Sequence, residues 1–211
     1  ADHSVLSGEK IYLPLPRIRS DVLSVEQALA YRRSIREYLD SPLTIMEISQ
    51  LLWAAYGISD PVHGFKTTPS AGATYPLEIY VVVKTNGVKV NESHYLNPGV
   101  YKYVPDQHAL VLVKEGDYSG KLMEAALNQK WVGDAPVNIV ITAVFERTTR
   151  VYGDRGVRYV YLEAGHAGQN VYLEATSLGL GCVVIGAFHD EYVSEILGLK
   201  QGEEPIYIIP I

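Results

Sequence analysis

The longest regular pattern in this chain runs from about Val157 to Leu178, and it constrains the fold more than any other stretch. Apolar or small side chains recur there every three or four positions, at Tyr161, Ala164, Gly165, Gly168, Val171, Tyr172, Ala175 and Leu178. This period predicts one long amphipathic helix, which Gly179 ends. A glycine inside a helix costs about 1 kcal/mol relative to alanine, so Gly165 and Gly168 lead us to expect another backbone close against this helix.

Runs rich in β-branched residues predict strands between the helices. They cover residues 77–83, 99–104, 109–113, 137–144, 181–188 and 205–211. Capping boxes at Ser24 and Thr44 predict two further helices, and shorter helical patterns cover 118–129 and 189–197. No repeat or linker interrupts this mixed order. The sequence therefore predicts one α+β domain over residues 24–211, preceded by a proline-containing arm over residues 1–23.

Composition and charge exclude several classes of protein. The formal net charge of -6 argues against a nucleic-acid binder, and no stretch approaches the roughly 20 apolar residues that a membrane span needs. The single cysteine, Cys182, rules out a disulfide framework and suits a reducing cytosol, so we expect a cytoplasmic protein. The start at Ala1 has no signal-peptide pattern but also no initiating Met, which leaves a removed targeting segment open. The six histidines show no paired ligand spacing, so we expect no metal.

Arg32, Arg33 and Arg36 surround Ser34 at the end of the helix that Ser24 begins. Such local positive charge in an acidic chain suits a compact dianion such as a phosphate monoester, because guanidinium groups match its oxygens in charge and geometry. The same stretch also fits a plain helix end, where the helix dipole favours basic side chains. The stretch alone leaves both interpretations open.

Two other segments fit a planar cofactor that carries a phosphate. Pro69, Ser70, Ala71 and Gly72 open a loop of small residues over which a flat ring can lie, although an ordinary loop before a strand would look the same. The run 181–188 passes through Ile185, Gly186 and Ala187, whose backbone N–H groups can face a ligand without steric cover. Cys182 lies in the same apolar run, which indicates a buried side chain and not a nucleophile.

Five short motifs occur one after another along the chain. They are 32–38 (RRSIREY), 51–57 (LLWAAYG), 69–76 (PSAGATYP), 165–173 (GHAGQNVYL) and 178–181 (LGLG). In these motifs the chain resembles the nitroreductase superfamily, in particular its SagB-type (thiazole-oxide-synthase-like) dehydrogenase branch, from about Ile11 to the end. The resemblance implies a nitroreductase-like α+β fold, in which helices wrap a central, mostly antiparallel sheet. It also implies an intertwined homodimer with FMN bound at the interface.

The resemblance further implies a role for each candidate residue. Arg32, Ser34 and Arg36 would hold the phosphate and ribityl chain of FMN, with Arg33 assisting. The loop Pro69, Ser70, Ala71 and Gly72 would lie along the flavin ring of the partner subunit. Asn128 or Gln129 would bond the pyrimidine edge, and Gly186 or Ala187, beside Ile185, would present an N–H near flavin N5. No side chain is then expected to be catalytic, because the chemistry belongs to the flavin.

The implied function is an FMN-dependent oxidoreductase that transfers hydride by a ping-pong mechanism from NAD(P)H through flavin N5 to an electron-poor small molecule. An azoline-oxidising peptide dehydrogenase of the SagB type is an alternative, and so is a flavin carrier or sensor without turnover. Two departures from the family pattern matter. Many nitroreductases have Asn and Gln where this chain has Ala73 and Tyr75, and the basic residue that commonly completes the phosphate site near the C-terminus does not occur before Ile211.

Overall fold

A six-stranded sheet forms the centre of the fold, in a computed structural model that describes residues 8–211. The strand order is β1-β9-β8-β5-β10-β11, and every neighbouring pair is antiparallel. The strands are β1 (Lys10–Tyr12), β5 (Leu77–Val83), β8 (Gly99–Val104), β9 (Ala109–Glu115), β10 (Val137–Val144) and β11 (Glu203–Pro210). The strands expected at 77–83 and 137–144 thus match β5 and β10 in full.

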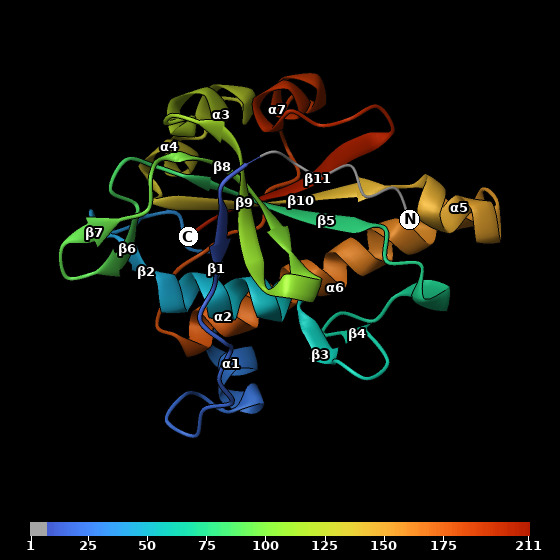
Figure 1. The fold of residues 1–211 in the computed structure, drawn as a ribbon, viewed down its shortest axis with the longest axis horizontal. Helices are drawn as coiled ribbons and strands as arrows, with labels where there is room; N and C mark the ends of the chain where they lie inside the picture. The colour runs from blue at the N-terminus through green and yellow to red at the C-terminus, as the bar shows by residue number, and fades with distance from the viewer. Residues whose placement is uncertain (1–7) are drawn as a thin grey trace.

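Helices cover both faces of this sheet (Figure 1). One face carries α2 (Ile45–Tyr56) and the long α6 (Arg155–Ser177), while the other carries α3 (Ser119–Ala125), α4 (Lys130–Asp134) and α7 (Asp190–Leu197). Alternate residues of a strand point to opposite faces. Accordingly, Ile79 and Val81 of β5 belong to the core under α2 and α6, and Tyr80 and Val82 belong to the opposite core. The expected α+β fold with a mostly antiparallel sheet is confirmed.

The two predicted capping boxes both form. The Ser24 hydroxyl accepts from the N–H of Gln27 at 3.2 Å, while the Gln27 side chain accepts from the N–H of Ser24 at 2.9 Å. Thr44 and Glu47 make the same reciprocal pair at the start of α2. These caps satisfy N–H groups that the first turn leaves unpaired. The first cap places α1 (Val25–Tyr31) directly before the arginine cluster.

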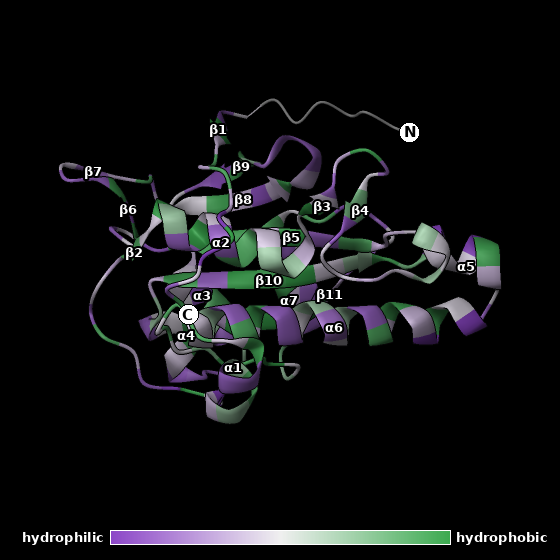
Figure 2. Ribbon diagram, turned by 90° about the horizontal axis from the view of Figure 1, so that it is seen from below, coloured by the Kyte–Doolittle hydropathy of each residue, from purple (hydrophilic) through white to green (hydrophobic). Residues whose placement is uncertain are grey.

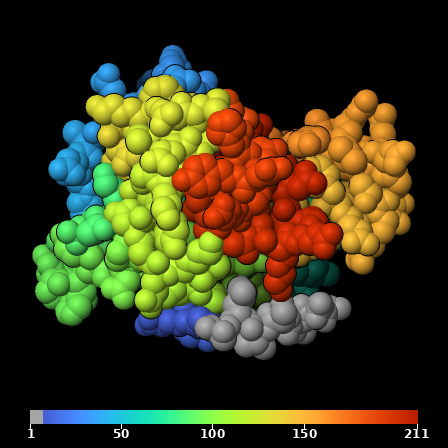
Figure 3. Space-filling view, turned by 90° about the horizontal axis from the view of Figure 1, so that it is seen from above, coloured from blue at the N-terminus to red at the C-terminus, as the bar shows by residue number. Residues whose placement is uncertain are grey.

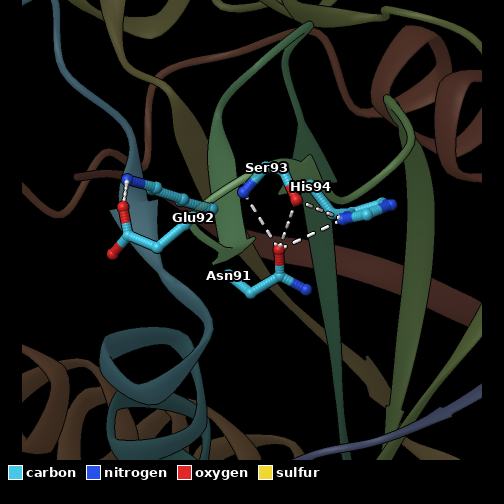
Figure 4. Close-up of polar contacts among 5 residues, drawn as sticks. Asn91, Glu92, Ser93 and His94 are labelled. Carbon is cyan, nitrogen blue, oxygen red and sulfur yellow. Dashed lines mark hydrogen bonds and ion pairs between the residues drawn. The ribbon is translucent and has the colours of Figure 1, made fainter.

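A short three-stranded sheet lies at one end of the molecule, with β2 (Leu43–Thr44), β6 (Val88–Asn91) and β7 (His94–Tyr95). Figure 4 shows the hairpin between β6 and β7, where the side-chain oxygen of Asn91 accepts from the N–H of Ser93 at 3.0 Å. The same oxygen lies 3.1 Å from Nδ1 of His94. All three residues lie in this one turn. The contacts therefore close the hairpin locally and do not reach the sites discussed below.

Two expected elements are different in the structure. The helix expected over 118–129 is shorter, because α3 ends at Ala125 and Leu127 and Asn128 adopt positive φ angles of 59° and 57°. A separate helix, α4, begins beyond the expected range at Lys130. The run 181–188 is extended but is not a regular strand. Only Cys182 and Ile185 form single bridges in it, to Ser34 and Ile208 respectively. An apolar run of this kind looks like a strand in sequence whether or not it finds a continuous partner.

The glycines of the long helix do not serve the purpose expected of them within this chain. A Cβ on Gly165 would meet no atom within 4 Å, and one on Gly168 would meet nothing closer than Tyr207 and Val184, at an ordinary 3.7 Å. The close approach occurs instead at Gly156, where a Cβ would lie 2.9 Å from the backbone of Thr149. Thr149 belongs to α5 (Glu146–Tyr152), a helix that the sequence did not lead us to expect.

The two ends of the molecule differ in shape. Helix α5 and the beginning of α6 project from one end, as the ribbon seen from below and the space-filling view from above both show (Figures 2 and 3).

The expected arm lies at the edge of the sheet, where Lys10–Tyr12 is strand β1 paired with β9. Its first seven residues lie outside the described part of the chain. One pair of short strands completes the fold: β3 (Ile58–Asp60) pairs with β4 (Phe65–Lys66).

Candidate functional site

The arginine cluster and the extended run after α6 lie side by side. Ser34 forms a parallel bridge with Cys182, and the N–H of Ile35 donates to the carbonyl of Cys182 at 2.9 Å. A Cβ on Gly181 would lie 2.8 Å from Cγ2 of Ile35, so the absence of a side chain allows this approach. Two of the three segments that the sequence singled out are therefore brought together.

Tyr172 of α6 connects these two segments. Its hydroxyl lies 2.9 Å from Oγ of Ser34 and accepts from the N–H of Val184 at 2.9 Å. The guanidinium carbon of Arg32 lies 5.0 Å from the centre of the Tyr172 ring, which is within the range of a cation–π contact. In the sequence, Tyr172 belongs to the apolar face of the helix and to the stretch 165–173, but neither feature indicates these hydroxyl contacts. Its hydroxyl was a weak signal, because Tyr161 carries another on the same stripe.

The three guanidinium groups of the cluster have no acidic partner among the described residues. Arg33 donates to the carbonyl groups of Ala30 and Arg32, at 3.1 and 2.7 Å. Arg36 lies 5.5 Å from the centre of the Trp131 ring. Elsewhere in the chain, Arg19 and Arg147 do pair with carboxylates. Uncompensated guanidinium groups beside a hydroxyl are the donor set that a phosphate monoester requires, so the residues fit the phosphate of FMN.

Tyr38 ties the end of the cluster to the sheet. Its single hydroxyl hydrogen is shared between the carbonyl of Ile35, at 2.8 Å, and that of Pro210 in β11, at 3.2 Å. Burial is the main reason why the pKa of Tyr38 is raised, and the hydroxyl therefore remains a donor. The turn that follows α1 is thus fixed at both ends, by Ser34 and by Tyr38.

The turn between α3 and α4 reaches the same region. Nε2 of Gln129 donates to the carbonyl of Ala187 at 2.9 Å and to that of Ala126 at 2.8 Å. The amide nitrogen of Gln129 is thus used within the chain, and its side-chain oxygen has no hydrogen-bond partner among residues 8–211. Gly186 and Ala187 are exposed, and a Cβ on Gly186 would meet nothing closer than the Tyr207 ring at 3.9 Å. The neighbouring Ile185 is held by two backbone hydrogen bonds with Ile208, at 2.8 and 3.0 Å.

The loop Pro69–Gly72 lies at a different position along α6. Oγ of Ser70 donates to Oε2 of Glu163 at 2.7 Å. Glu163 precedes Tyr172 by nine residues, which corresponds to about 13.5 Å along a helix axis. No side-chain hydrogen bond or ion pair therefore joins the third segment singled out in the sequence to the arginine cluster.

No group of three or more His, Cys, Asp or Glu side chains in residues 8–211 has the arrangement of a metal site. Over the same range, none of the helices is both long and apolar enough to cross a bilayer.

Comparison with known proteins identifies the family of this chain. The profile of the nitroreductase family matches residues 29–211. Protein MJ1384 of Methanocaldococcus jannaschii is 50% identical over 204 residues, which cover 97% of each chain. The microcin B17-processing protein McbC of Escherichia coli is 28% identical over 160 residues, which cover 75% of this chain and 58% of McbC.

Solved structures show the same fold. The crystal structure of a nitroreductase-family protein from Ralstonia eutropha JMP134 has a TM-score of 0.79 at 29% identity, covering 95% of this chain and 87% of that one. A chain of the E. coli microcin synthetase McbBCD complex with truncated pro-MccB17 has a TM-score of 0.70 at 25% identity, covering 91% and 74%.

Proposed function

This chain belongs to the nitroreductase family, and we propose that it is an FMN-dependent oxidoreductase that transfers hydride from NAD(P)H to an electron-poor small molecule by a ping-pong mechanism. The observation that carries the proposal is the arginine cluster. Arg32, Arg33 and Arg36 bring three positive charges to one turn, and none of them pairs with a carboxylate of the described residues. The Ser34 hydroxyl lies in the same turn, and the run that pairs with Ser34 at Cys182 leads to the exposed backbone of Gly186 and Ala187.

The residues of the site bind and orient, and bound FMN would supply the hydride chemistry itself. Arg32 and Arg36 are assigned to the phosphate, with Arg33 assisting, and Ser34 to the phosphate or ribityl chain. The N–H of Gly186 or Ala187 is assigned to the ring, where a fixed donor stabilises developing negative charge. Gln129, with its side-chain oxygen not engaged in the chain, or Asn128 is assigned to the pyrimidine edge. Ile185 holds this backbone in place through β11.

A homodimer completes the proposed site. Within one protomer, Pro69–Gly72 and the arginine cluster contact different parts of α6, so the loop of one protomer is assigned to the ring held by the other. Large apolar side chains are exposed along the helices on this side of the molecule: Val25, Leu29 and Tyr31 on α1, and Val157, Tyr161 and Leu162 on α6. Gly165, which faces open space in this chain, lies on the same long helix.

The proposal is tested on the protein as purified. We expect a visible flavin absorption spectrum, and bleaching of it when NADH or NADPH is added without oxygen. A colourless protein that neither binds added FMN nor gains thermal stability from it would contradict the proposal. A flavin that binds but resists both nicotinamides would point to a carrier or sensor, or to a different reductant.

Similarity to McbC supports a second candidate, oxidation of a peptide azoline to an azole. In this reaction the substrate itself is the hydride donor. Reduction of the bound flavin by an azoline-containing peptide, together with slow reduction by both nicotinamides, would favour this candidate over the first.

A further inference from the structure

The loop after Pro69 has an unfavourable backbone conformation. Gly72 has a φ of 58°, and Ala73 and Tyr75 have φ angles of 52° and 45°. A residue with a Cβ seldom adopts such angles, and it does so only where surrounding contacts hold it there. Two such residues in four positions therefore require a specific restraint.

The restraint begins at the hydroxyl of Ser70. This hydroxyl accepts from the N–H of Tyr75 at 2.9 Å, which closes the turn across the residues with positive φ. It donates to Oε2 of Glu163 at 2.7 Å. Both hydrogen bonds lie within the protomer, so the Ser70 side chain has its donor engaged by the protein and offers a ligand mainly its backbone.

Glu163 anchors the loop to the core. It is only 3% exposed, and its Oε1 accepts from the hydroxyl of Tyr56 in α2 at 2.5 Å. The ammonium nitrogen of Lys66 lies 4.1 Å from the centre of the Tyr56 ring and 4.9 Å from that of Tyr75, close to both ends of this network. One buried carboxyl group thus joins α6, α2 and the strained loop.

Burial of a carboxyl group is unfavourable unless its oxygens are hydrogen-bonded. Desolvation raises the pKa of Glu163, although its bonds with Tyr56 and Ser70 act in the opposite direction. An apolar residue at position 163 would be buried without this cost of desolvation. The hydrogen bonds with Tyr56 and Ser70 explain why a glutamate is present, because together they define one conformation of the loop.

We propose that Glu163 is a positioning residue that fixes the loop Ser70–Tyr75 through the Ser70 hydroxyl and so sets the backbone that faces the flavin ring of the partner protomer. This inference rests on the proposed function, in which that loop covers the ring. Glu163 itself touches neither cofactor nor substrate in this arrangement.

The test uses Glu163→Ala, which removes both bonds, and Glu163→Gln, which can still accept from Tyr56 and can donate to Ser70. Glu174→Ala is the matched control, because Glu174 lies on the same helix and bonds Gln50 instead of the loop. Hydrogen exchange of the loop amides, measured on FMN-free protein, reports the restraint without any flavin. We expect exchange to rise at least tenfold in Glu163→Ala and to stay near wild type in the other two variants.

A second readout uses FMN. In Glu163→Ala we expect the visible circular dichroism of bound flavin to change, while FMN affinity falls less than tenfold because the arginine cluster is intact. A rescue of the spectrum by Glu163→Gln would support positioning over general destabilisation. If Glu163→Ala does not fold, Ser70→Ala removes the same link together with the acceptor for the N–H of Tyr75, and its loop amides must exchange at least tenfold faster than those of the wild type.

Unchanged loop exchange in both Glu163→Ala and Ser70→Ala would overturn the restraint. A wild-type protein that fails to bind FMN would overturn the proposed function and, with it, the assignment of the loop to a flavin. The two failures are distinguishable, because the exchange measurement needs no cofactor.

Discussion

Cys182 lies beside the arginine cluster, yet its surroundings make it unreactive. It is 3% exposed, and burial raises the pKa of its thiol to about 12. A protonated, inaccessible thiol is a poor nucleophile. We expect an aromatic disulfide reagent at about pH 8 to label Cys182 only after unfolding. Rapid labelling of the native protein would show that the segment around Cys182 opens to solvent.

Glu78 carries a prediction about pH. Its carboxylate pairs with Lys102 at 3.1 Å and with Arg147. Burial opposes ionisation, but the two cations outweigh it and lower the pKa of Glu78 below the usual 4.5. A lowered carboxyl pKa contributes stability above the unfolded-state pKa, and this contribution is lost as the pH falls through the folded-state pKa.

We therefore expect Glu78→Gln to lower the free energy of unfolding by about 2 to 3 kcal/mol at neutral pH, since it leaves two partly buried cations without their partner. The difference from wild type should shrink below about pH 4. Urea unfolding at both pH values checks this. Glu92→Gln is the control, because Glu92 is exposed and its 3.5 Å pair with Lys89 is on the surface. An equal effect of both substitutions would contradict the account.

At the scale of elements, local chemistry could be predicted and long-range partners could not. The capping boxes at Ser24 and Thr44 depend on residues three apart, and β5 and β10 are continuous β-branched runs, so both are visible in sequence. The end of α3 ahead of Leu127 and Asn128 is not marked in the sequence, because neither of these positive-φ residues is a glycine. Whether residues 181–188 form a strand depends on the partners of Cys182 and Ile185, which are Ser34 and Ile208, about 150 and 25 residues away in the chain.

The cap of α2 gives a prediction at this scale. Thr44→Ala removes an acceptor for the N–H of Glu47, and we expect it to lower the free energy of unfolding by about 1 kcal/mol. Thr44→Ser keeps the hydroxyl and should remain within a few tenths of a kcal/mol of wild type. Chemical denaturation measures both. A loss of equal size in Thr44→Ser would mean that the methyl group, and not the cap, stabilises this turn.

At the scale of the molecule, the sequence predicted the arginine cluster and the Gly186 segment, and the structure brings these together. The sequence could not predict the roles of Tyr172 and Tyr38, because their hydroxyl groups bond to backbone and side chains far away in the chain. Nor could it indicate that Ser70 is held by Glu163, since a helical carboxylate normally faces solvent. The assignment of these residues to a cofactor remains a prediction.

The exposed apolar side chains of α1 and α6 predict association of two chains. We expect a dimer in sedimentation velocity, and a shift towards monomer with loss of FMN when Leu29 and Leu162 are both replaced by Glu. Val62→Glu is the control, because Val62 is 84% exposed on the loop between β3 and β4. A wild-type monomer that binds FMN fully would contradict this arrangement.

The central claim is that the arginine cluster grips the phosphate of FMN, and the most direct measurement compares FMN with riboflavin. Fluorescence titration of FMN-free protein should show much tighter binding of FMN, because riboflavin has no phosphate. In the double variant Arg32→Gln, Arg36→Gln we expect FMN affinity to fall about a hundredfold or more, while riboflavin affinity changes little. Arg19→Gln, which removes a surface arginine paired with Asp21, should leave both affinities unchanged. Equal affinity of the wild-type protein for the two flavins, or FMN binding that survives the double substitution, would contradict the claim.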